Sequence, residues 1–314
     1  MKKGGIPKFV IYALLIACCS IPLFFKIPIP NKPSDPSVDF YKTLSALKEG
    51  DVVLLGSDWT GSTRGESKGH MKAILRTLMR KNVKFVIWSS ADPQAPRAAL
   101  DVIAEVNAER VANKEEKFQR WTQWVSAGYY PNSDVAINAV AQDIRTAFGS
   151  RRENDTNGVQ QQIFKSPVME KIKSVTDFDL VIDCTASKTT DFHVQFISAK
   201  NVPLMFAVTG VMGPETQVFY NSKQIKGFLS GLKGVFDMEQ MMEKGVNVPG
   251  PNGTEPAVKT DRVSGEIAPL PGESIGQGTK YYPTLHVALL LMIVMIGIGN
   301  YEMIAARKRQ KGNA

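Results

Sequence analysis

The sequence is poor in the residues that build disulfide frameworks and metal sites. Only three of its 314 residues are cysteines and only three are histidines. Cys18 and Cys19 lie together in an apolar N-terminal stretch, so Cys184 has no partner for a disulfide within a folded domain. The histidines at positions 70, 193 and 286 lack the close spacing of zinc ligands. We therefore expect no disulfide and no bound metal, and we expect Cys184 to be a buried, unreactive thiol rather than a nucleophile.

Signatures of nucleotide binding are missing as well. The sequence holds neither a GxGxxG nor a GxxxxGK(S/T) pattern, so the fingerprints of dinucleotide-binding and P-loop proteins are absent. Internal repeats are absent too. We predict no resident cofactor.

The formal charge of +8 first suggests a nucleic-acid partner, but the distribution of the charge favours a membrane. Much of the excess lies at the two ends, in Lys2, Lys3 and Lys8 and in Arg307, Lys308, Arg309 and Lys311. Each basic end flanks an apolar stretch, and basic residues in that position mark the cytoplasmic side of a membrane protein. We therefore expect contact with a membrane and none with nucleic acid.

Two apolar stretches, Phe9–Phe25 and about 282–304, are candidates for crossing a bilayer. Positive charge precedes the first stretch and follows the second, so we expect a cell-membrane protein with two spans, both termini in the cytoplasm and the main domain outside. The expected segments are an N-terminal transmembrane signal-anchor (1–26), a linker (27–45), an extracytoplasmic α/β domain (46–245), a Pro/Gly-rich tether (246–281), a transmembrane helix (282–306) and a basic cytoplasmic tail (307–314).

The processing of the first stretch stays open. It fits an uncleaved anchor and also a cleavable signal peptide. The quartet Leu15-Ile16-Ala17-Cys18 resembles a bacterial lipobox, which makes Cys18 a candidate for lipidation. Against lipidation, the apolar run continues past Cys18, where a lipoprotein would normally turn polar.

The region between the spans alternates strand-like and helix-like segments. Short β-branched runs predict strands buried on both faces, at Val52–Leu55, Val83–Trp88, Leu180–Cys184 and Leu204–Val208, with a further strand within 124–131. Helices are expected at about 67–80, 96–121, 134–148, 167–175 and 191–199, and a surface loop at 149–166. This alternation predicts a three-layer α/β sandwich with a mainly parallel sheet, Rossmann-like or flavodoxin-like, flanked by an N-terminal and a C-terminal transmembrane helix.

The loop after the first predicted strand lies where doubly wound folds bind ligands. Before the next helix it is rich in hydroxyl and cationic groups, namely Thr60, Ser62, Thr63 and Arg64. This segment resembles the phosphate loop of flavodoxins, and it precedes a helix N-terminus that attracts anions. The carboxylates of Asp58 and Glu66 weaken that interpretation, and the same residue types cap helices and form turns without a ligand. A small anionic ligand and simple capping therefore both remain open.

Acidic and hydroxyl residues also follow the other predicted strands. Because the carboxyl ends of parallel strands meet at one edge of a sheet, we expect a shared rim that contains Asp58, Ser89, Asp92, Asp183, Thr185 and Thr209. Converging aspartates suit acid–base catalysis or a divalent cation, but they equally suit helix capping, which we favour. His70 and His193 lie on predicted helices, and we expect both to be partly exposed.

The segment after the last predicted strand, about 220–245, resembles a pair of helices interrupted by Gly227, Gly231 and Gly234. Spaced glycines let another backbone come close, so these three are candidates for contact with a partner. A glycine-rich junction between helices is the simpler explanation, and we favour it.

Five stretches occur in an order that resembles a family of uncharacterised prokaryotic membrane-anchored proteins with a Rossmann-like extracytoplasmic domain. They are GDVVLLGSDWTGSTRGE, LMRKNVKFVIWS, GYYPNSDVAINAVAQDIRTAF, DFDLVIDCTAS and YNSKQIKGFLSGLKGVFDMEQMM, within about residues 40–245. The most distinctive parts are the turn at Gly128–Pro131, the following Asp143–Arg145 and the GLKG stretch at 231–234. The resemblance implies the fold and the membrane anchoring, but it implies no activity and no catalytic residue.

Together these features lead to a hypothesis of function. We expect a non-catalytic ligand-sensing or scaffolding module that serves as an accessory subunit of a membrane complex, with a membrane-protein partner or a second copy of itself. Anchoring at both ends raises the effective concentration of partners in the same membrane. Two alternatives stay open, namely a membrane-anchored enzyme acting on a phosphorylated or nucleotide-like substrate at the strand rim, and a flavin- or nucleotide-binding domain.

Overall fold

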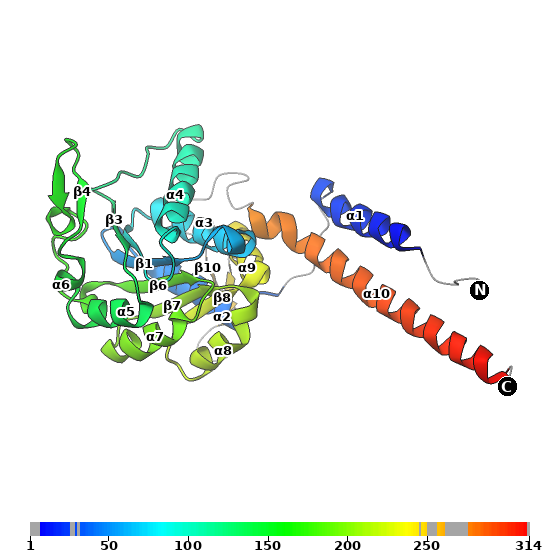
Figure 1. The fold of residues 1–314 in the computed structure, drawn as a ribbon. Helices are drawn as coiled ribbons and strands as arrows, with labels where there is room; N and C mark the ends of the chain where they lie inside the picture. The colour runs from blue at the N-terminus through cyan, green and yellow to red at the C-terminus, as the bar shows by residue number, and fades with distance from the viewer. Residues whose placement is uncertain are drawn as a thin grey trace. The chain divides into compact units, whose positions relative to one another are not determined.

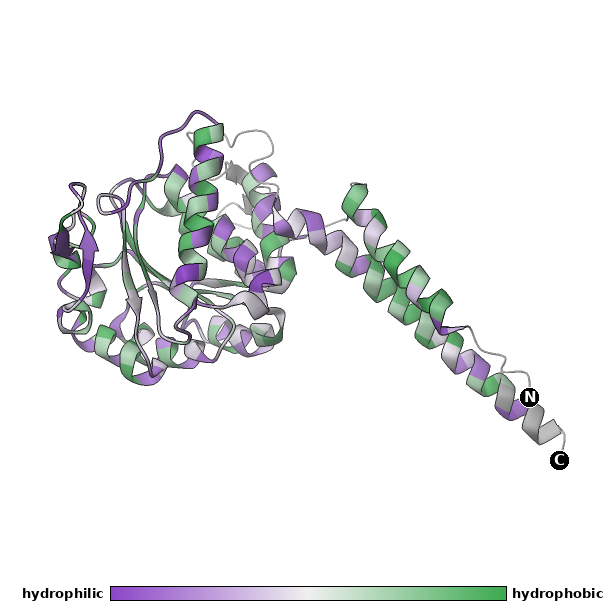
Figure 2. Ribbon diagram, turned by 45° about the horizontal axis from the view of Figure 1, so that its top comes forward, coloured by the Kyte–Doolittle hydropathy of each residue, from purple (hydrophilic) through white to green (hydrophobic). Residues whose placement is uncertain are grey.

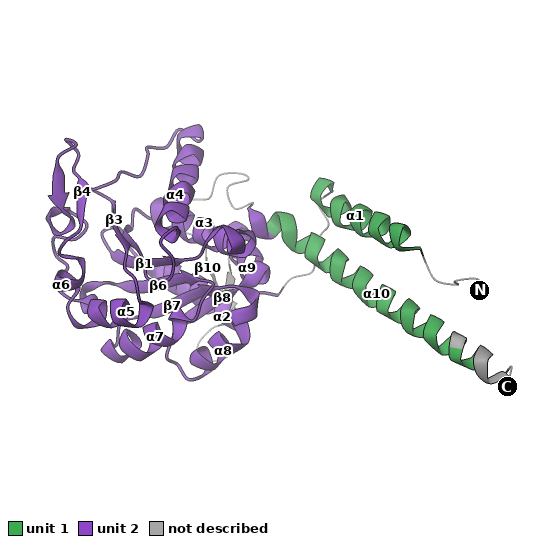
Figure 3. Ribbon diagram, viewed as in Figure 1, with its two compact units in different colours: residues 1–31, 279–314 green, residues 32–278 purple. Residues whose placement is uncertain are grey.

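The computed structural model of the chain describes residues 7–25, 29, 32–244, 246–249, 256–260 and 276–312. The chain forms two compact units (Figure 3). One unit is an α/β domain at Lys32–Gly278, and the other holds the two ends of the chain, Met1–Asn31 and Thr279–Ala314.

The α/β domain is built on a sheet of six strands in the order β3-β2-β1-β6-β7-β8 (Figure 1). Every neighbouring pair in this sheet is parallel. The strands are β1 (Val52–Asp58), β2 (Lys84–Ser89), β3 (Trp124–Tyr129), β6 (Leu180–Thr185), β7 (Leu204–Val208) and β8 (Gly227–Ser230). The chain winds outward from β1 in one direction and then returns to β6 on its other side, which is the strand order of a doubly wound Rossmann sheet. The predicted parallel α/β fold is confirmed.

Helices cover both faces of the sheet. Because successive side chains of a strand point to opposite faces, each strand contributes to two hydrophobic cores, one on each face. One face packs against α2 (Asp35–Ala46), α3 (Arg64–Arg80), α4 (Ala95–Ala112) and α9 (Gly231–Lys244), and the other against α5 (Ser133–Gln142), α6 (Ile144–Phe148), α7 (Thr189–Phe196) and α8 (Gly213–Asn221). Val53 and Leu55 belong to the first core and Leu54 to the second. Both faces of β1 are therefore buried, which is why its sequence is continuously apolar.

Short elements complete the domain. They are the 3-10 turns η1 (Gly61–Thr63), η2 (Ile163–Lys165), η3 (Val175–Asp177), η4 (Ser198–Lys200) and η5 (Gly210–Met212), and two antiparallel pairs, β4 (Arg152–Asn154) with β5 (Gln160–Gln162) and β9 (Val246–Pro249) with β10 (Pro256–Thr260). The predicted loop at 149–166 thus contains the β4–β5 hairpin.

Three helix predictions need correction. The expected helix at 167–175 is a series of turns, and the expected helix at 96–121 ends at Ala112. The expected helix at 134–148 is split at Asp143, because the Asp143 carboxylate accepts hydrogen bonds from the N–H groups of Arg145 and Thr146 and so caps a new helix.

The expected helical pair at 220–245 is also wrong, because its middle is the edge strand β8. Gly227 begins this strand, and a Cβ atom there would lie only 2.5 Å from the backbone nitrogen of Phe40 in α2. The glycine therefore lets α2 pack closely on the edge of the sheet. Phe40, Tyr41 and Leu44 of α2 are fully buried, so the second half of the expected linker at 27–45 belongs to the domain.

The expected tether at 246–281 lies partly outside the described residues. Within it, β9 and β10 pair with each other, and Gln277 begins helix α10 (Gln277–Gly312). The first residues of α10 are held by the domain: the Gly278 N–H donates to Glu239 Oε1 at 3.1 Å.

Among the described residues, α10 is the one helix long and apolar enough to cross a membrane (Figure 2). Helix α1 (Lys8–Phe24) has 17 residues and a length of about 25 Å, short of the roughly 30 Å hydrocarbon core of a bilayer. The C-terminal span is thus a candidate by length and composition, whereas the N-terminal helix falls below that length.

Candidate functional site

The predicted rim exists, but its residues have different environments. Asp58, Ser89, Asp183 and Thr185 are buried at the carboxyl ends of β1, β2 and β6. Asp92 and Thr209 are partly buried in the loops that follow β2 and β7. Thr60, Ser62, Thr63 and Arg64 form the accessible turn between β1 and α3.

Asp58 is a structural carboxylate. Its Oδ1 accepts hydrogen bonds from Ser89 Oγ (2.7 Å), Ser90 N (2.7 Å) and Ala91 N (3.0 Å), and its Oδ2 accepts one from Ser90 Oγ (3.0 Å). Only 3% of Asp58 is exposed. These four hydrogen bonds join the end of β1 to the end of β2 and the turn after it. Asp58 therefore stabilises the rim.

Asp183 is fully buried next to His193. Its Oδ2 accepts a hydrogen bond from Thr189 Oγ1 at 2.8 Å and lies 3.5 Å from His193 Nδ1, whereas its Oδ1 has no hydrogen-bond partner. Burial, reinforced by the nearby Asp58 charge, raises the pKa of Asp183 well above its usual value. No surface reaches this pair, so it is not presented to a substrate.

The buried histidines and cysteine complete the inner part of the rim. His193 Nδ1 lies 2.9 Å from Thr189 O, which makes Nδ1 the donor, and burial lowers the pKa of His193. Burial also lowers the pKa of His70 to about 4. Both imidazoles are fully buried, so the expectation that they are partly exposed is wrong. Cys184 is buried as predicted, with its Sγ 3.5 Å from Ser67 O, and burial raises the pKa of the thiol.

The strand order reverses between β1 and β6. Glu66, in the first turn of α3, bridges to the turn after β7 at this crevice. Its Oε2 accepts a hydrogen bond from the Gly210 N–H at 2.8 Å, and this amide lies at the start of η5, after β7. Doubly wound folds usually bind the phosphates of a dinucleotide in this crevice. Here a carboxylate already holds one of the amides, and its negative charge opposes an anion at the same place.

An open cleft of about 470 Å³ lies instead beside this point, between α3 and α4. Its lining includes Trp59, Arg64, Lys68, Arg97, Asp101 and Glu105. The turn after β1 and the turn after β2 form one end of the cleft, next to the N-termini of α3 and α4, and we call this end the upper end. The lower end lies farther along the two helices, at Asp101 and Glu105. Two of the four polar residues named in the predicted phosphate loop, Thr60 and Arg64, belong to this cleft.

The charges in the cleft are only partly paired. Lys68 Nζ lies 2.5 Å from Glu105 Oε1, and Arg97 Nε lies 3.1 Å from Asp101 Oδ1. Within the part of the chain that the structure describes, the Arg64 side chain makes no ion pair or hydrogen bond. The cleft therefore presents one free guanidinium beside two helix N-termini.

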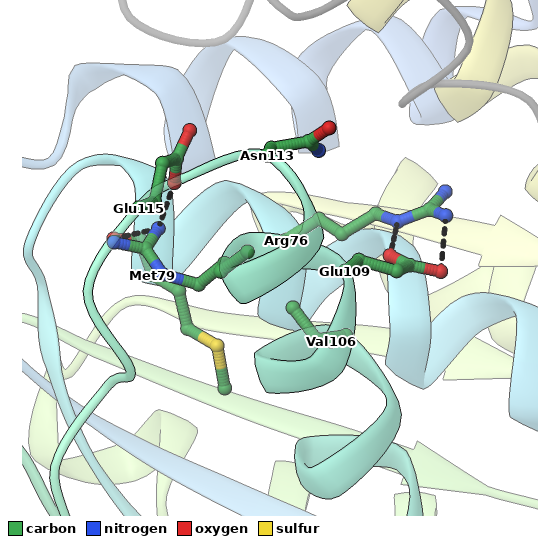
Figure 4. A pocket seen from close by; sticks show the side chains of 7 residues that line it. Arg76, Met79, Val106, Glu109, Asn113 and Glu115 are labelled. Atoms are coloured by element: carbon green, nitrogen blue, oxygen red, sulfur yellow. Dashed lines mark hydrogen bonds and ion pairs between the residues drawn. The ribbon is translucent and has the colours of Figure 1, made fainter.

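The opposite end of the α3–α4 interface is different. There Arg76 forms a two-point ion pair with Glu109, at 2.9 and 3.0 Å, and the cavity between the helices has a volume of only about 10 Å³ (Figure 4). Arg110 pairs with Glu115 at 2.9 Å in the same place. These charges neutralise each other: the Arg76–Glu109 pair joins α3 to α4, and the Arg110–Glu115 pair joins α4 to the segment that follows it.

The three glycines expected to contact a partner are buried inside the domain. Gly231 has a φ of +55°, and a Cβ there would lie 3.0 Å from Gly210 Cα. At Gly234, a Cβ would lie 2.9 Å from the Leu229 carbonyl carbon. As at Gly227, their small size serves packing within the chain.

Sequence analysis did not identify Lys68, Arg97, Asp101 and Glu105 as cleft residues. Their four-residue spacing on two consecutive helices is a signal, but it acquires meaning only when the two helices are known to lie side by side. No protein-family model and no curated protein matches this chain.

Proposed function

We propose that this protein is a membrane-anchored ligand-sensing module without catalytic activity, and that it acts as an accessory subunit of a membrane complex. The observation that carries this proposal is the double role of α3. Its first turns line the α3–α4 cleft through Arg64 and Lys68, and its next residue, Gly69, packs against the start of the apolar helix α10.

The contact between α3 and the start of α10 is close. A Cβ atom at Gly69 would lie 3.3 Å from Gln277 Cβ and 2.8 Å from Val235 of α9. A Cβ atom at Gly278 would lie 2.4 Å from the Phe236 nitrogen. A helix held this tightly transmits small displacements, because packed interfaces resist continuous deformation. These contacts between α3, α9 and the first residues of α10 support the proposal that α3 senses a ligand in the cleft.

The rim argues for sensing over catalysis. The Asp58 carboxylate accepts four hydrogen bonds from the end of β2 and the turn that follows it, and Asp183 is fully buried. A general acid or base must reach its substrate, usually within a hydrogen-bond distance. Asp58 and Asp183, the two best candidates for this role in the sequence, are both buried.

The membrane arrangement that we propose has two spans, with both termini in the cytoplasm and the α/β domain outside the cell membrane. The basic residues before α1 and at the end of α10 support this orientation. A second anchor at α1 would keep the cleft close to the bilayer, where a membrane partner is concentrated. This arrangement agrees with the resemblance to prokaryotic membrane-anchored proteins.

Two measurements on the full-length protein in mild detergent test the function. Mass spectrometry of the purified complex should find a membrane protein in stoichiometric amount. In parallel, ³¹P NMR with adenosine monophosphate and ribose 5-phosphate should detect no conversion. Turnover of either compound would refute the non-catalytic proposal, and a protein that purifies alone would refute the accessory role.

A further inference from the structure

We propose that the α3–α4 cleft binds a small phosphate monoester that carries free hydroxyl groups, such as a sugar phosphate or a nucleoside monophosphate. This inference rests on the proposed sensing function and names the chemical class that is sensed. Four observations support it, concerning the size of the cleft, its cationic end, an unpartnered buried donor and its acidic end.

The dimensions suit a small metabolite. The volume of about 470 Å³ lies within the usual range of small-molecule sites, roughly 300–1,000 Å³. Along α4 the cleft extends from Arg97 to Glu105, and eight residues of helix rise by about 12 Å. A monophosphate of a sugar or nucleoside has a comparable length, whereas a dinucleotide is about twice as long.

The upper end of the cleft favours an anion. Arg64 and Arg97 are both exposed there, and Arg64 has no ion-pair partner among the described residues. Thr60 adds a hydroxyl group beside them. The first turns of α3 and α4 begin at the same end, so two positive helix-dipole ends lie near the guanidinium groups. A dianionic phosphate matches this combination of groups.

Trp59 adds an unpartnered donor to the residues that line the cleft. It lines the cleft, only 3% of it is exposed, and its indole Nε1 has no hydrogen-bond partner. The indole N–H is a donor only, so the missing partner is an acceptor. A buried donor without a partner is destabilising, and an oxygen of a bound ligand would satisfy it.

The lower end of the cleft selects against additional phosphates. Asp101 and Glu105 of α4 belong to the lining. Asp101 is paired with Arg97, and Glu105 is paired with Lys68 and, at 3.5 Å, with Lys72. A carboxylate has about four acceptor positions, so each retains capacity for a hydroxyl donor. A second phosphate here would meet two negative charges. The site therefore matches one phosphate at the upper end and hydroxyl groups at the lower end.

Isothermal titration calorimetry on the full-length protein in detergent tests this assignment. The probes are adenosine monophosphate, ribose 5-phosphate, inorganic phosphate and adenosine diphosphate. We expect both monoesters to bind at least tenfold more tightly than inorganic phosphate and adenosine diphosphate. Equal affinity for all four probes would overturn the proposed selectivity, and no binding of either monoester at 10 mM would overturn the site.

Variants locate the binding. Arg64→Gln and Arg97→Gln should each weaken monoester binding at least tenfold, whereas Lys226→Gln, the same change at an exposed position outside the cleft, should leave it unchanged. Trp59→Phe should weaken binding about threefold to tenfold, because it removes the donor and keeps an aromatic ring. Asp101→Asn should lower the affinity for ribose 5-phosphate relative to the affinity for inorganic phosphate, because it weakens the acceptor for the sugar hydroxyl groups. If both arginine variants bind like the parent protein, the ligand is elsewhere and the assignment fails.

These outcomes separate this inference from the proposed function. A protein that purifies with a membrane partner and binds no monoester refutes the ligand class and retains the accessory role. A protein that binds monoesters through Arg64 and also converts them refutes the non-catalytic function and retains the site.

Discussion

Gly56 gives the sharpest test of how the rim is packed. It lies in β1 directly opposite Asp183 of β6, and a Cβ atom at Gly56 would lie 2.4 Å from Asp183 Oδ1 and 3.3 Å from Asp183 Cα. The Asp183 side chain has little freedom to move, because Thr189 holds its other oxygen at 2.8 Å. We predict that Gly56→Ala destabilises the domain by forcing this carboxylate away.

The magnitude follows from two contributions. Overpacking of a tight core costs about 1–3 kcal/mol, and loss of the hydrogen bond between Thr189 and Asp183 adds about 1 kcal/mol. The sum of about 2–4 kcal/mol corresponds to a decrease in Tm of roughly 5–15 °C for a domain of this size. Differential scanning calorimetry of the full-length protein measures this decrease.

The matched control is Gly61→Ala, because a Cβ atom at Gly61 meets no atom within 4 Å. Its Tm should stay within about 2 °C of the parent protein, as for other surface changes. A second test places Gly56→Ala in an Asp183→Ala background, where the clash is absent and the additional cost should be smaller. If Gly56→Ala and Gly61→Ala have the same Tm, the tight contact between β1 and β6 is refuted.

Three further predictions concern the rim and the N-terminal helix. Asp58→Asn should lower the free energy of unfolding by about 1–3 kcal/mol, since neutral acceptors form weaker hydrogen bonds, and urea denaturation would contradict this if the midpoint did not move. His70 has a pKa lowered to about 4 in the folded state, against about 6.5 when unfolded, so the unfolded chain binds the proton first as the pH falls. Stability should therefore decrease between pH 6.5 and 4, with roughly 3 kcal/mol of the decrease due to His70. The decrease should be smaller by about that amount in His70→Gln, where the buried His193 still contributes in the same direction, and an unchanged pH profile in that variant would exclude His70 as a cause. If α1 is a retained anchor, the intact mass of the purified protein should equal that of the full chain, whereas a lipid adduct on Cys18 would show lipoprotein processing.

Local sequence patterns were sufficient for most of the sheet. The apolar runs around Leu54, Ile182 and Phe206 are continuous because both faces of these strands are covered, and that pattern predicted the parallel sheet correctly. The strand β8 was missed because it is only four residues long and begins with a glycine. The reason for that glycine, the approach of α2, is not visible in the local sequence.

The role of the polar residues required the tertiary structure. Sequence alone left Asp58 as a catalytic group, a metal ligand or a cap, and only its position opposite Ser89 and Ser90 assigns it a structural role. Arg64 was recognised next to a helix N-terminus, whereas Arg97 was not. These two residues share a cleft because β1 and β2 are neighbours in the sheet, which brings α3 and α4 together.

The sequence by itself therefore determined the alternation of strands and helices, the buried faces and the apolar C-terminal helix, because these depend on the spacing of neighbouring residues. Only the tertiary structure decided which polar groups are consumed by hydrogen bonds and which remain free. That distinction depends on contacts between residues such as Glu66 and Gly210, which are 144 positions apart in the chain.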